Sequence, residues 1–357
     1  MNLAAAWQAL WGPPPRDDGR LAAYPPPFPR GWYRLTGADL RAGEVREVRA
    51  FERSFVVFRG EDGAVGALDA TCPHLGAHLG DGTVVGGCLR CPFHGWTFRP
   101  DGAVDHVPGA RRAPRARAVA YDLRERDGMI LVWWDGAGPG PAAYEPEVHA
   151  DVADGRLTFR GEFAWGDVQM HLVEFAENSV DFAHFDVLYG QMTLPWTRIP
   201  LPGLRVHHDA RWERDPARPW VSWFHDAAHL RLFGRPIPRS GATVRILMDG
   251  PGGLVSFRFT LPELGDILLY QTHLPVGPLT QRVGFRWYAD RGIPSALVSY
   301  VVGTWVSQWR ADLGIWERKR YLPKPVLCEA DGPVHALRAW YGQFYAAGPG
   351  DPPSGTS

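Results

Sequence analysis

Two short segments in the first third of the chain each combine one cysteine with one histidine. Cys72 and His74 stand in Cys-Pro-His, Cys91 and His94 stand in Cys-Pro-Phe-His, and sixteen residues separate the two segments. A Rieske [2Fe–2S] centre needs this donor set, because one iron takes two thiolates and the other takes two imidazoles. Imidazole ligation raises the reduction potential above that of an all-cysteine cluster. The two segments therefore predict a one-electron relay.

A structural zinc site is the competing interpretation, because zinc also binds two cysteines and two histidines. Zinc fingers usually supply both cysteines from one segment and both histidines from another, whereas each segment here supplies one of each. Cys88 forms a CxxC with Cys91, which keeps zinc or a disulfide as an alternative. We interpret Cys88 as a small buried residue, with Arg90 and Trp96 packed around the cluster.

The elements around these ligands indicate a small all-β domain over residues 28–135. Short strands are expected at Phe51–Arg59 and Gly95–Phe98, and the glycines between them allow tight turns. The sequence GAGPGP at 136–141 predicts a linker. Residues 1–27 are expected to form an N-terminal extension, in which MNLAAAWQALW is a docking helix or a frayed tail rather than a membrane anchor.

Residues 142–346 are predicted to form a second domain, an antiparallel sheet with flanking helices, which makes the whole chain α+β. Helices are expected at His171–Tyr189, with Gly190 as its cap, at Ser295–Lys319 and at Val334–Phe344. The tail 347–357 is expected to be disordered. The predicted strands are Arg156–Phe163, Trp220–Phe224, Thr243–Met248, Leu254–Thr260, Ile267–His273 and Arg282–Trp287.

Composition limits the partners and the compartment. The net charge of −1 gives no basic footprint for nucleic acid. Four cysteines, two of them candidate cluster ligands, make no disulfide framework. We therefore expect a cytoplasmic protein, with peripheral attachment to a membrane as the alternative. The chain has no GxGxxG fingerprint in a βαβ unit, so an NAD(P)H-dependent reductase would be a separate protein.

A second iron with open positions for O2 would use two histidines and one carboxylate on one face. The segment Glu174–Gly190 offers Asn178, Asp181 and His184 at intervals of three residues. Asp181 and His184 would share a face of a helix. Taken alone, such a pair is more often a hydrogen-bonded surface pair than a metal site.

The chain resembles the Rieske non-haem iron oxygenases of the cholesterol 7-desaturase and 3-ketosteroid 9α-hydroxylase type. The matching segments are CPHLGAHLG, CPFHGWTF, DLGIWERKRYLPKPV and the C-terminal LCEADGPVHALRAWYGQFY, and the resemblance extends over residues 31–345. It implies a [2Fe–2S] cluster, a mononuclear Fe(II), and hydroxylation or desaturation of a sterol or steroid. It also implies a flavin or ferredoxin reductase as partner and a homotrimer.

The resemblance assigns roles to individual residues. Cys72, His74, Cys91 and His94 would hold the cluster. Asp181 and Asn178 would form the catalytic pair. His184 and Asp312 would be the ligands of the mononuclear iron. Asp181 would link His94 of one subunit to His184 of the next and carry the electron between them.

One position departs from the pattern of this family. A second histidine is expected five residues after His184, where this chain has Tyr189. Residues i and i+5 lie about 140° apart on a regular helix, so the pattern requires a local distortion or a helix end. Tyr189 could ligate the iron, another residue (His207, His208 or Asp186) could complete the site, or the site could be weak or lost.

Two alternative functions follow from these observations. A sterol-binding or electron-transfer Rieske protein would fit an impaired iron site, and an aromatic-ring dioxygenase would fit the cluster equally well. A sterol pocket requires aromatic and aliphatic lining. The candidates for that lining are Trp196, Trp223, Phe224, Phe257, Trp287, Tyr300 and Trp305.

Overall fold

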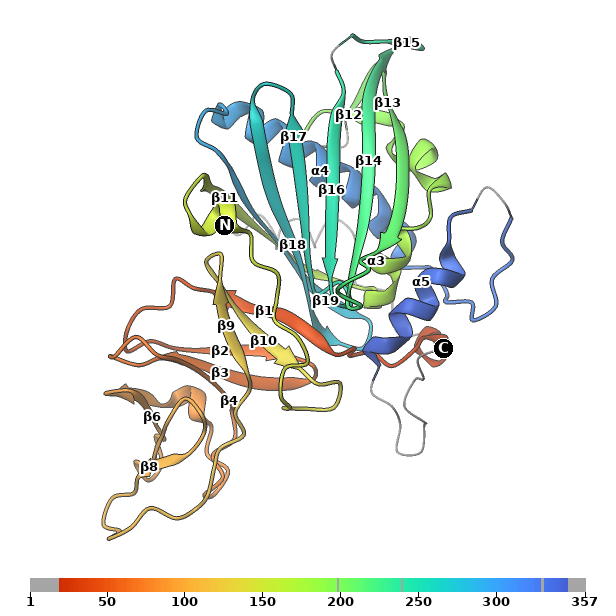
Figure 1. Ribbon diagram of the computed structural model, residues 1–357. Helices are drawn as coiled ribbons and strands as arrows, with labels where there is room; N and C mark the ends of the chain where they lie inside the picture. Colours follow the sequence, from red (N-terminus) through yellow and green to blue (C-terminus); the bar gives the residue numbers. More distant parts are fainter. Residues whose placement is uncertain (1–18, 198, 239, 329–330, 346–357) are drawn as a thin grey trace. The chain divides into compact units, whose positions relative to one another are not determined.

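The computed structural model describes residues 19–197, 199–238, 240–328 and 331–345, apart from the side chain of Asp186. The predicted N-terminal helix or tail and the predicted disorder of 347–357 lie outside the described residues. The chain divides into two compact units (Figure 1). Phe28–Pro146 form one unit, and the residues before Phe28 join those from Glu147 onward in the other.

The unit Phe28–Pro146 is built from three small antiparallel sheets. One contains β1 (Gly31–Gly37), β10 (Met129–Trp134) and β9 (Leu123–Arg126), and the next contains β2 (Val45–Ala50), β3 (Arg53–Arg59) and β4 (Val65–Asp69). The third contains β5 (Thr83–Val85), β6 (Cys88–Arg90), β7 (Thr97–Phe98) and β8 (Val104–His106), and a short 3₁₀ turn, η2 (Leu79–Asp81), precedes it. The predicted all-β fold of this part is confirmed.

The strand predicted to begin at Phe51 begins two residues later. Phe51 and Glu52 both have positive φ (52° and 56°) and form a two-residue hairpin turn between the paired Ala50 and Arg53. Such turns match the natural twist of the two strands they join. The Phe51 ring stacks on Trp134 at 4.3 Å, so burial of the ring offsets the strained backbone.

The second unit contains a nine-stranded antiparallel sheet, which confirms the predicted α+β class. Its order is β11–β19–β18–β17–β16–β14–β13–β12, and β15 pairs with β14 at one end. The bounds are β11 (Leu157–Val168), β12 (Gln191–Thr193), β13 (Pro200–Arg214), β14 (Val221–Leu232), β15 (Arg235–Pro236), β16 (Ala242–Asp249), β17 (Leu254–Leu261), β18 (Gly265–Gly277) and β19 (Thr280–Asp290).

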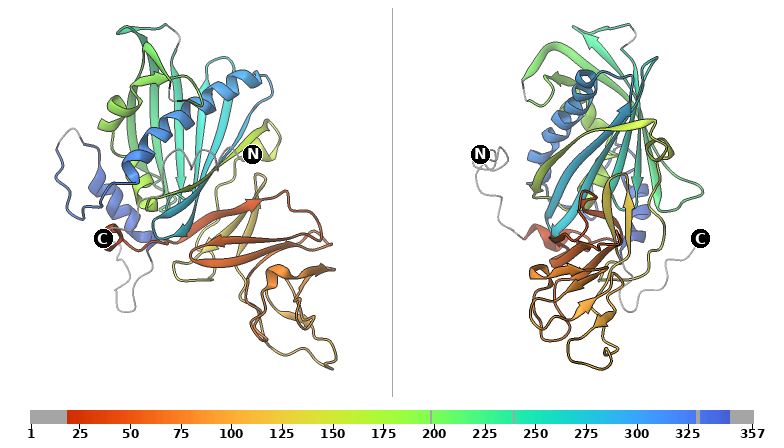
Figure 2. Two further views of the ribbon diagram at one scale, coloured as in Figure 1. Left: turned by 180° about the vertical axis from the view of Figure 1, so that it is seen from behind. Right: turned by 90° about the vertical axis from the view of Figure 1, so that its left-hand side faces the viewer.

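The long helix α4 (Ser295–Trp316) runs across one face of this sheet (Figure 2). Val298, Val302, Val306 and Trp309 of α4 are buried in the core that the sheet and the helix share. The remaining helices and turns are η1 (Arg20–Ala23), α2 (Ala150–Ala153), α3 (Leu172–Asn178), the π-helical turn η3 (Phe185–Tyr189), α5 (Val334–Tyr341) and η4 (Gly342–Phe344). No helix of the described residues is both long and apolar enough to cross a membrane.

The helix predicted over His171–Tyr189 is interrupted, so that prediction is wrong in its middle. The helix α3 ends at Asn178, where the Ser179 hydroxyl donates to the Ala176 carbonyl at 2.7 Å and competes with the next helical hydrogen bond. Gly190 has φ −53°, which is an ordinary helical value rather than a left-handed cap. The apolar residues recur at helical spacing, but they belong to two separate helical segments, α3 and η3.

The fifteen-residue strand β13 was not predicted from the sequence. Two prolines, a glycine and many charged residues hide its alternation. It pairs along its length with β14, residue Leu204 opposite Leu232 and Arg214 opposite Ser222. This strand matters because it carries His207 and His208.

Candidate functional site

The two cysteine–histidine loops have the same backbone hydrogen bonds. In the first, the Cys72 N–H donates to the Ala77 carbonyl and Gly76 N–H donates back to Cys72, both at 2.9 Å. In the second, the corresponding bonds join Cys91 with Trp96 at 2.8 Å and Gly95 with Cys91 at 3.2 Å. Both glycines lie in the left-handed region, at φ 76° and 72°. A side chain there would strain each loop, which explains both glycines.

The four predicted ligands face one another across these loops. Cys72 and Cys91 are each 2% exposed, and the rings of His74 and His94 lie 4.6 Å apart. Trp96 stacks on His74 at 4.4 Å, as expected of a residue packed beside the cluster. A pair of thiols beside a pair of imidazoles fits a [2Fe–2S] centre with mixed ligands.

Cys88 takes no part in this arrangement. It is half-buried rather than buried, and all four cysteines are free of disulfides. Burial raises the pKa of its thiol, and the carboxylate of Asp105 adds to this effect. The thiol therefore has a polar neighbour of its own outside the set of four ligands.

Replacing Cys91 with serine should remove the cluster, whereas replacing Cys88 with serine should not. Cys91→Ser is expected to abolish the visible absorption of the cluster, because serine cannot replace a buried thiolate ligand. Cys88→Ser is expected to leave absorption and iron content unchanged. Loss of the spectrum in the Cys88 variant would support the zinc or CxxC interpretation instead.

The helix α3 positions Asn178 beside the candidate iron ligands of the second unit. The His171 imidazole accepts from the Val173 N–H at 3.1 Å and caps the helix. Glu174, fully buried, accepts from the Tyr24 hydroxyl at 2.6 Å and pairs with the ammonium group of Lys319. These bonds hold the start of α3, so that Asn178 at its end has a fixed position.

Removing the cation from this buried pair should destabilise the second unit. Lys319→Met is expected to lower the free energy of unfolding by about 2–3 kcal/mol, because the Glu174 carboxylate stays buried without its charged partner. Chemical denaturation measures the loss. Arg318→Met, an exposed neighbour, is the matched control and should change stability by less than about 0.5 kcal/mol. Equal effects of both substitutions would contradict the role of the pair.

The π-helical turn η3 supplies the distortion that the spacing of His184 and Tyr189 requires. A turn with hydrogen bonds from i to i+5 contains more residues than an α-helical turn, so residues five apart lie closer to one face. The rings of His184 and Tyr189 accordingly lie 5.0 Å apart. His184 Nδ1 contacts the backbone carbonyl of Asp181, and because a carbonyl only accepts, Nδ1 carries the hydrogen. The other ring nitrogen of His184 is then free to bind a metal.

Asp312 of α4 reaches the same place from the opposite side. The Tyr189 hydroxyl donates to Asp312 Oδ2, and the Asn178 amide donates to the Tyr189 oxygen at 3.1 Å and to Asp312 Oδ2 at 3.5 Å. Burial raises the pKa of Asp312 to about 7. Burial and the neighbouring carboxylate raise the pKa of Tyr189 well above its usual value. Tyr189 is thus a neutral phenol in this state.

Two buried atoms at this site have no hydrogen-bond partner, His184 Nε2 and Asp312 Oδ1. Buried polar atoms are almost always paired, so both point to a missing ligand. Among the described residues, no three of His, Cys, Asp and Glu lie close enough to hold one ion. The residues therefore fit an iron in part: a histidine and a carboxylate are available, and a phenol fills the third position.

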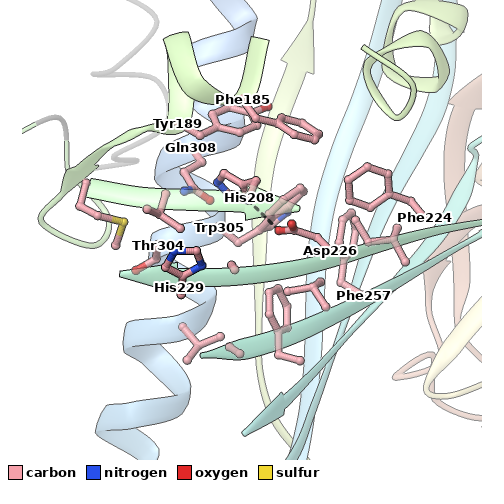
Figure 3. Close-up of a pocket in the computed structure, with 18 of the residues that line it drawn as sticks. Phe185, Tyr189, His208, Phe224, Asp226, His229, Phe257, Thr304, Trp305 and Gln308 are labelled. Atoms are coloured by element: carbon pink, nitrogen blue, oxygen red, sulfur yellow. Dashed lines mark hydrogen bonds and ion pairs between the residues drawn. The ribbon is translucent and has the colours of Figure 1, made fainter. Parts of the chain in front are cut away.

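A cavity of about 300 Å³ lies beside this site, between α4 and one face of the sheet (Figure 3). Its wall is largely apolar and includes Phe185, Phe224, Val244, Ile246, Phe257 and Trp305. Tyr189 also lines it, so the candidate iron site borders the cavity directly. A flat apolar molecule suits such a wall.

One buried polar pair interrupts the apolar wall. His208 Nδ1 lies 2.7 Å from Asp226 Oδ2, and Asp226 is 6% exposed (Figure 3). The Nε2 atom of His208 is buried without a partner, and its ring lies 6.4 Å from that of Tyr189. A neutral imidazole that donates Nδ1–H to the carboxylate accepts a hydrogen bond at Nε2. The pair can therefore bind a hydroxyl group inside the cavity.

The structure sorts the residues suggested by the sequence. It brings Asn178, His184, Tyr189 and Asp312 together, and it places His208 on the cavity wall and His207 against His229 at 5.0 Å. Four of the seven predicted aromatic residues line the cavity: Phe224, Phe257, Tyr300 and Trp305. Asp226 was not expected, since only the pairing of β13 with β14 brings it to His208.

One unit that can hold a redox cluster and another that can hold an iron beside an apolar cavity define an oxygenase of the Rieske type. Family comparisons agree with this class. Residues 32–120 match the Rieske [2Fe-2S] domain, and residues 249–345 match the 3-ketosteroid 9alpha-hydroxylase C-terminal domain.

The similarity to known proteins identifies the family to which the chain belongs. The chain is 32% identical to cholesterol 7-desaturase of Xenopus laevis, over 90% of this chain and 73% of that protein. It is 33% identical to the probable 3-ketosteroid-9-alpha-monooxygenase, oxygenase component, of Rhodococcus rhodochrous, over 90% of this chain and 81% of that protein. The chain belongs to this family of Rieske non-haem iron oxygenases, whose members use a [2Fe–2S] cluster and a mononuclear iron.

Solved structures share the fold at lower identity. NdmA of Pseudomonas putida CBB5 with caffeine gives a TM-score of 0.66 at 18% identity, over 87% of this chain and 89% of that one. Dicamba monooxygenase bound to dicamba gives 0.58 at 18% identity, over 88% and 96%. These likenesses support the architecture alone.

Proposed function

We propose that the protein is the oxygenase component of a system that hydroxylates or desaturates a sterol or steroid. The observation that carries this proposal is the apolar cavity lined by Tyr189, whose hydroxyl donates to Asp312, in a chain of the sterol and steroid branch of the family. Iron bound there supplies the activation of O2, and the cavity wall orients the substrate and excludes water.

We assign the cluster to Cys72, His74, Cys91 and His94, and the electron route to Asp181. Both ends of that route are open to a neighbour: His94 is exposed, and the Asp181 side chain is 47% exposed. Asp181 also lies 3.7 Å from His184 Nδ1. A homotrimer in which Asp181 of one subunit meets His94 of the next would use both groups. A separate NAD(P)H-dependent flavin or ferredoxin reductase would supply the electrons, and the cytoplasm is the proposed location.

Within the second unit, His184 and Asp312 would hold the iron. Tyr189 acts as a hydrogen-bond donor that fixes Asp312 rather than as a third ligand. Three contacts support this role: the phenol donates to Asp312, Asn178 holds the phenol, and the free oxygen of Asp312 remains for the metal. With fewer protein ligands, the iron would bind more weakly than at a complete triad.

The purified chain tests the activity when it is supplied with Fe(II), O2, NADPH and a reductase. Product from a panel of sterols and steroids, dependent on both O2 and reductant, is the expected result. A cluster that is reduced by the reductase without product from any member of the panel would leave only electron transfer or binding. Turnover of arenes but not sterols would instead favour the dioxygenase alternative.

A further inference from the structure

Two loops at one end of the large sheet expose large apolar side chains. The first covers residues 194–203, apart from residue 198, and runs from the end of β12 into the start of β13. The second covers residues 231–238 and runs from the end of β14 through β15 (Figure 1). The exposed fractions are 77% for Phe233, 59% for Ile199, and 45% each for Leu194 and Leu232. We call these four residues, together with Arg231 and Arg235, the tip surface.

The two loops are joined by a backbone hydrogen bond and by a close packing contact. The Phe233 N–H donates to the Gly203 carbonyl at 2.7 Å. A side chain on Gly203 would lie 2.3 Å from the Phe233 ring, so only glycine lets the ring cross there. Phe233 itself has a positive φ of 47°, which costs free energy for a bulky residue. The protein thus keeps an aromatic ring exposed in a defined, strained position.

Arginines accompany these apolar groups. Arg231 and Arg235 are exposed, and neither forms an ion pair within the part of the chain that the structure describes. Neither loop contains an aspartate or a glutamate. Apolar side chains beside unpaired cations are the combination that binds an anionic bilayer, because the rings enter the interface while the cations stay with the headgroups.

The tip surface is connected to the cavity wall. Leu230 and Ser240, on either side of the second loop, both line the cavity. The Ser240 hydroxyl accepts from the Leu230 N–H at 3.0 Å and donates to the Ile237 carbonyl at 2.8 Å, which closes the base of the loop. In the first loop, the Trp196 indole donates to the Ser299 carbonyl of α4 at 3.1 Å. Each loop is therefore anchored to an element of the cavity wall.

Tyr300 marks where the cavity reaches the surface. Its side chain lines the cavity and is 41% exposed, and it follows Ser299 on α4. A sterol is almost insoluble in water and dissolves in lipid. A surface that held the protein on a bilayer beside this opening would shorten the path of the substrate through water.

We propose that the tip surface docks the protein on an anionic lipid bilayer and presents the cavity to a substrate dissolved there. The reason for docking rests on the proposed sterol substrate, whereas the docking itself is a property of the two loops. No transmembrane segment is needed, because shallow insertion of Phe233 and Leu232 with two arginines at the headgroups gives reversible attachment.

Vesicle sedimentation of the full-length protein, without substrate or reductase, tests the docking. The protein is expected to bind phosphatidylglycerol-containing vesicles, to bind phosphatidylcholine vesicles much less, and to lose binding as salt is added. Arg231→Gln with Arg235→Gln should weaken binding about twenty-five-fold, from a factor of about five for each arginine. Leu232→Ser with Phe233→Ser should weaken it about tenfold or more. Leu264→Ser with Val326→Ser removes apolar groups of 49% and 99% exposure elsewhere and should have no effect.

The results separate docking from catalysis. Turnover of a sterol delivered by cyclodextrin should be unchanged in the tip variants, and turnover of the same sterol in vesicles should fall. The docking proposal is overturned if the wild-type protein binds no vesicle, or if the wild-type protein and the tip variants bind equally. Light scattering tests a second way in which the proposal would be overturned. A concentration-dependent dimer that is abolished by Leu232→Ser with Phe233→Ser would assign the tip surface to a contact with a second copy of the chain. Vesicle binding without turnover from either supply would count against the proposed function instead.

Discussion

Replacing Tyr189 with histidine is expected to increase the affinity of the second unit for Fe(II) by about tenfold or more. The π-helical turn already places position 189 at 5.0 Å from His184, ring to ring, and against Asp312. An imidazole there would add a ligand to a histidine and a carboxylate that each have one free atom. Iron analysis after dialysis against a chelator measures the change, and thermal unfolding with added Fe(II) measures it independently.

Replacing Tyr189 with phenylalanine tests whether its hydroxyl is an iron ligand or only a hydrogen-bond donor to Asp312. Tyr189→Phe keeps the ring and removes the donor to Asp312, so iron binding should change little. Tyr300→His adds an imidazole at the mouth of the cavity and should bind no further iron. Loss of iron in Tyr189→Phe would mean that the phenolate is itself a ligand. An unchanged affinity in Tyr189→His would show that the turn does not direct this side chain toward the metal.

The electron-storing part of this protein could be predicted from sequence because its ligands are local. Each loop carries its cysteine, histidine and left-handed glycine within five residues, so spacing alone specifies the turn. The candidate iron site was harder. His184 and Asp312 are far apart in the chain, and only the resemblance to a family joined them before the structure placed both beside Tyr189.

What the sequence concealed depends on strand pairing and on breaks in helices. The end of α3 at Asn178 and the turn η3 share one apolar pattern, which predicted a single helix. His208 and Asp226 meet because β13 and β14 pair in register, and β13 lacked the alternation that would have revealed it. A polar pair of this kind carries no sequence signal, since each residue alone resembles an ordinary surface group.

The pair of His208 and Asp226 is expected to make the enzyme prefer a substrate with a hydroxyl group. The cavity wall is otherwise largely apolar, so His208 Nε2 stays unpaired unless a substrate O–H reaches it. A substrate that lacks the hydroxyl leaves this buried acceptor unpaired, which costs about 1–3 kcal/mol and corresponds to roughly fivefold to a hundredfold in kcat/KM. In the fused rings of a sterol, an oxygen on the first ring lies one ring width from the carbons of the second. The ring centres of His208 and Tyr189 lie 6.4 Å apart, so a hydroxyl bound at His208 is expected to place that second ring near Tyr189.

A comparison of a 3-hydroxysterol with the matching hydrocarbon that lacks the oxygen measures this preference. His208→Leu should bring the ratio of the two kcat/KM values close to one, mainly by raising KM for the hydroxysterol, while iron content stays constant. His225→Leu is the matched control and should keep the wild-type ratio. His225 lies on the face of β14 opposite to Asp226 and is hydrogen-bonded to Glu213 at 3.0 Å. Loss of iron in the His208 variant would instead make His208 the missing ligand. An equal fall for both substrates would show that the pair supports the wall of the cavity rather than recognises the hydroxyl.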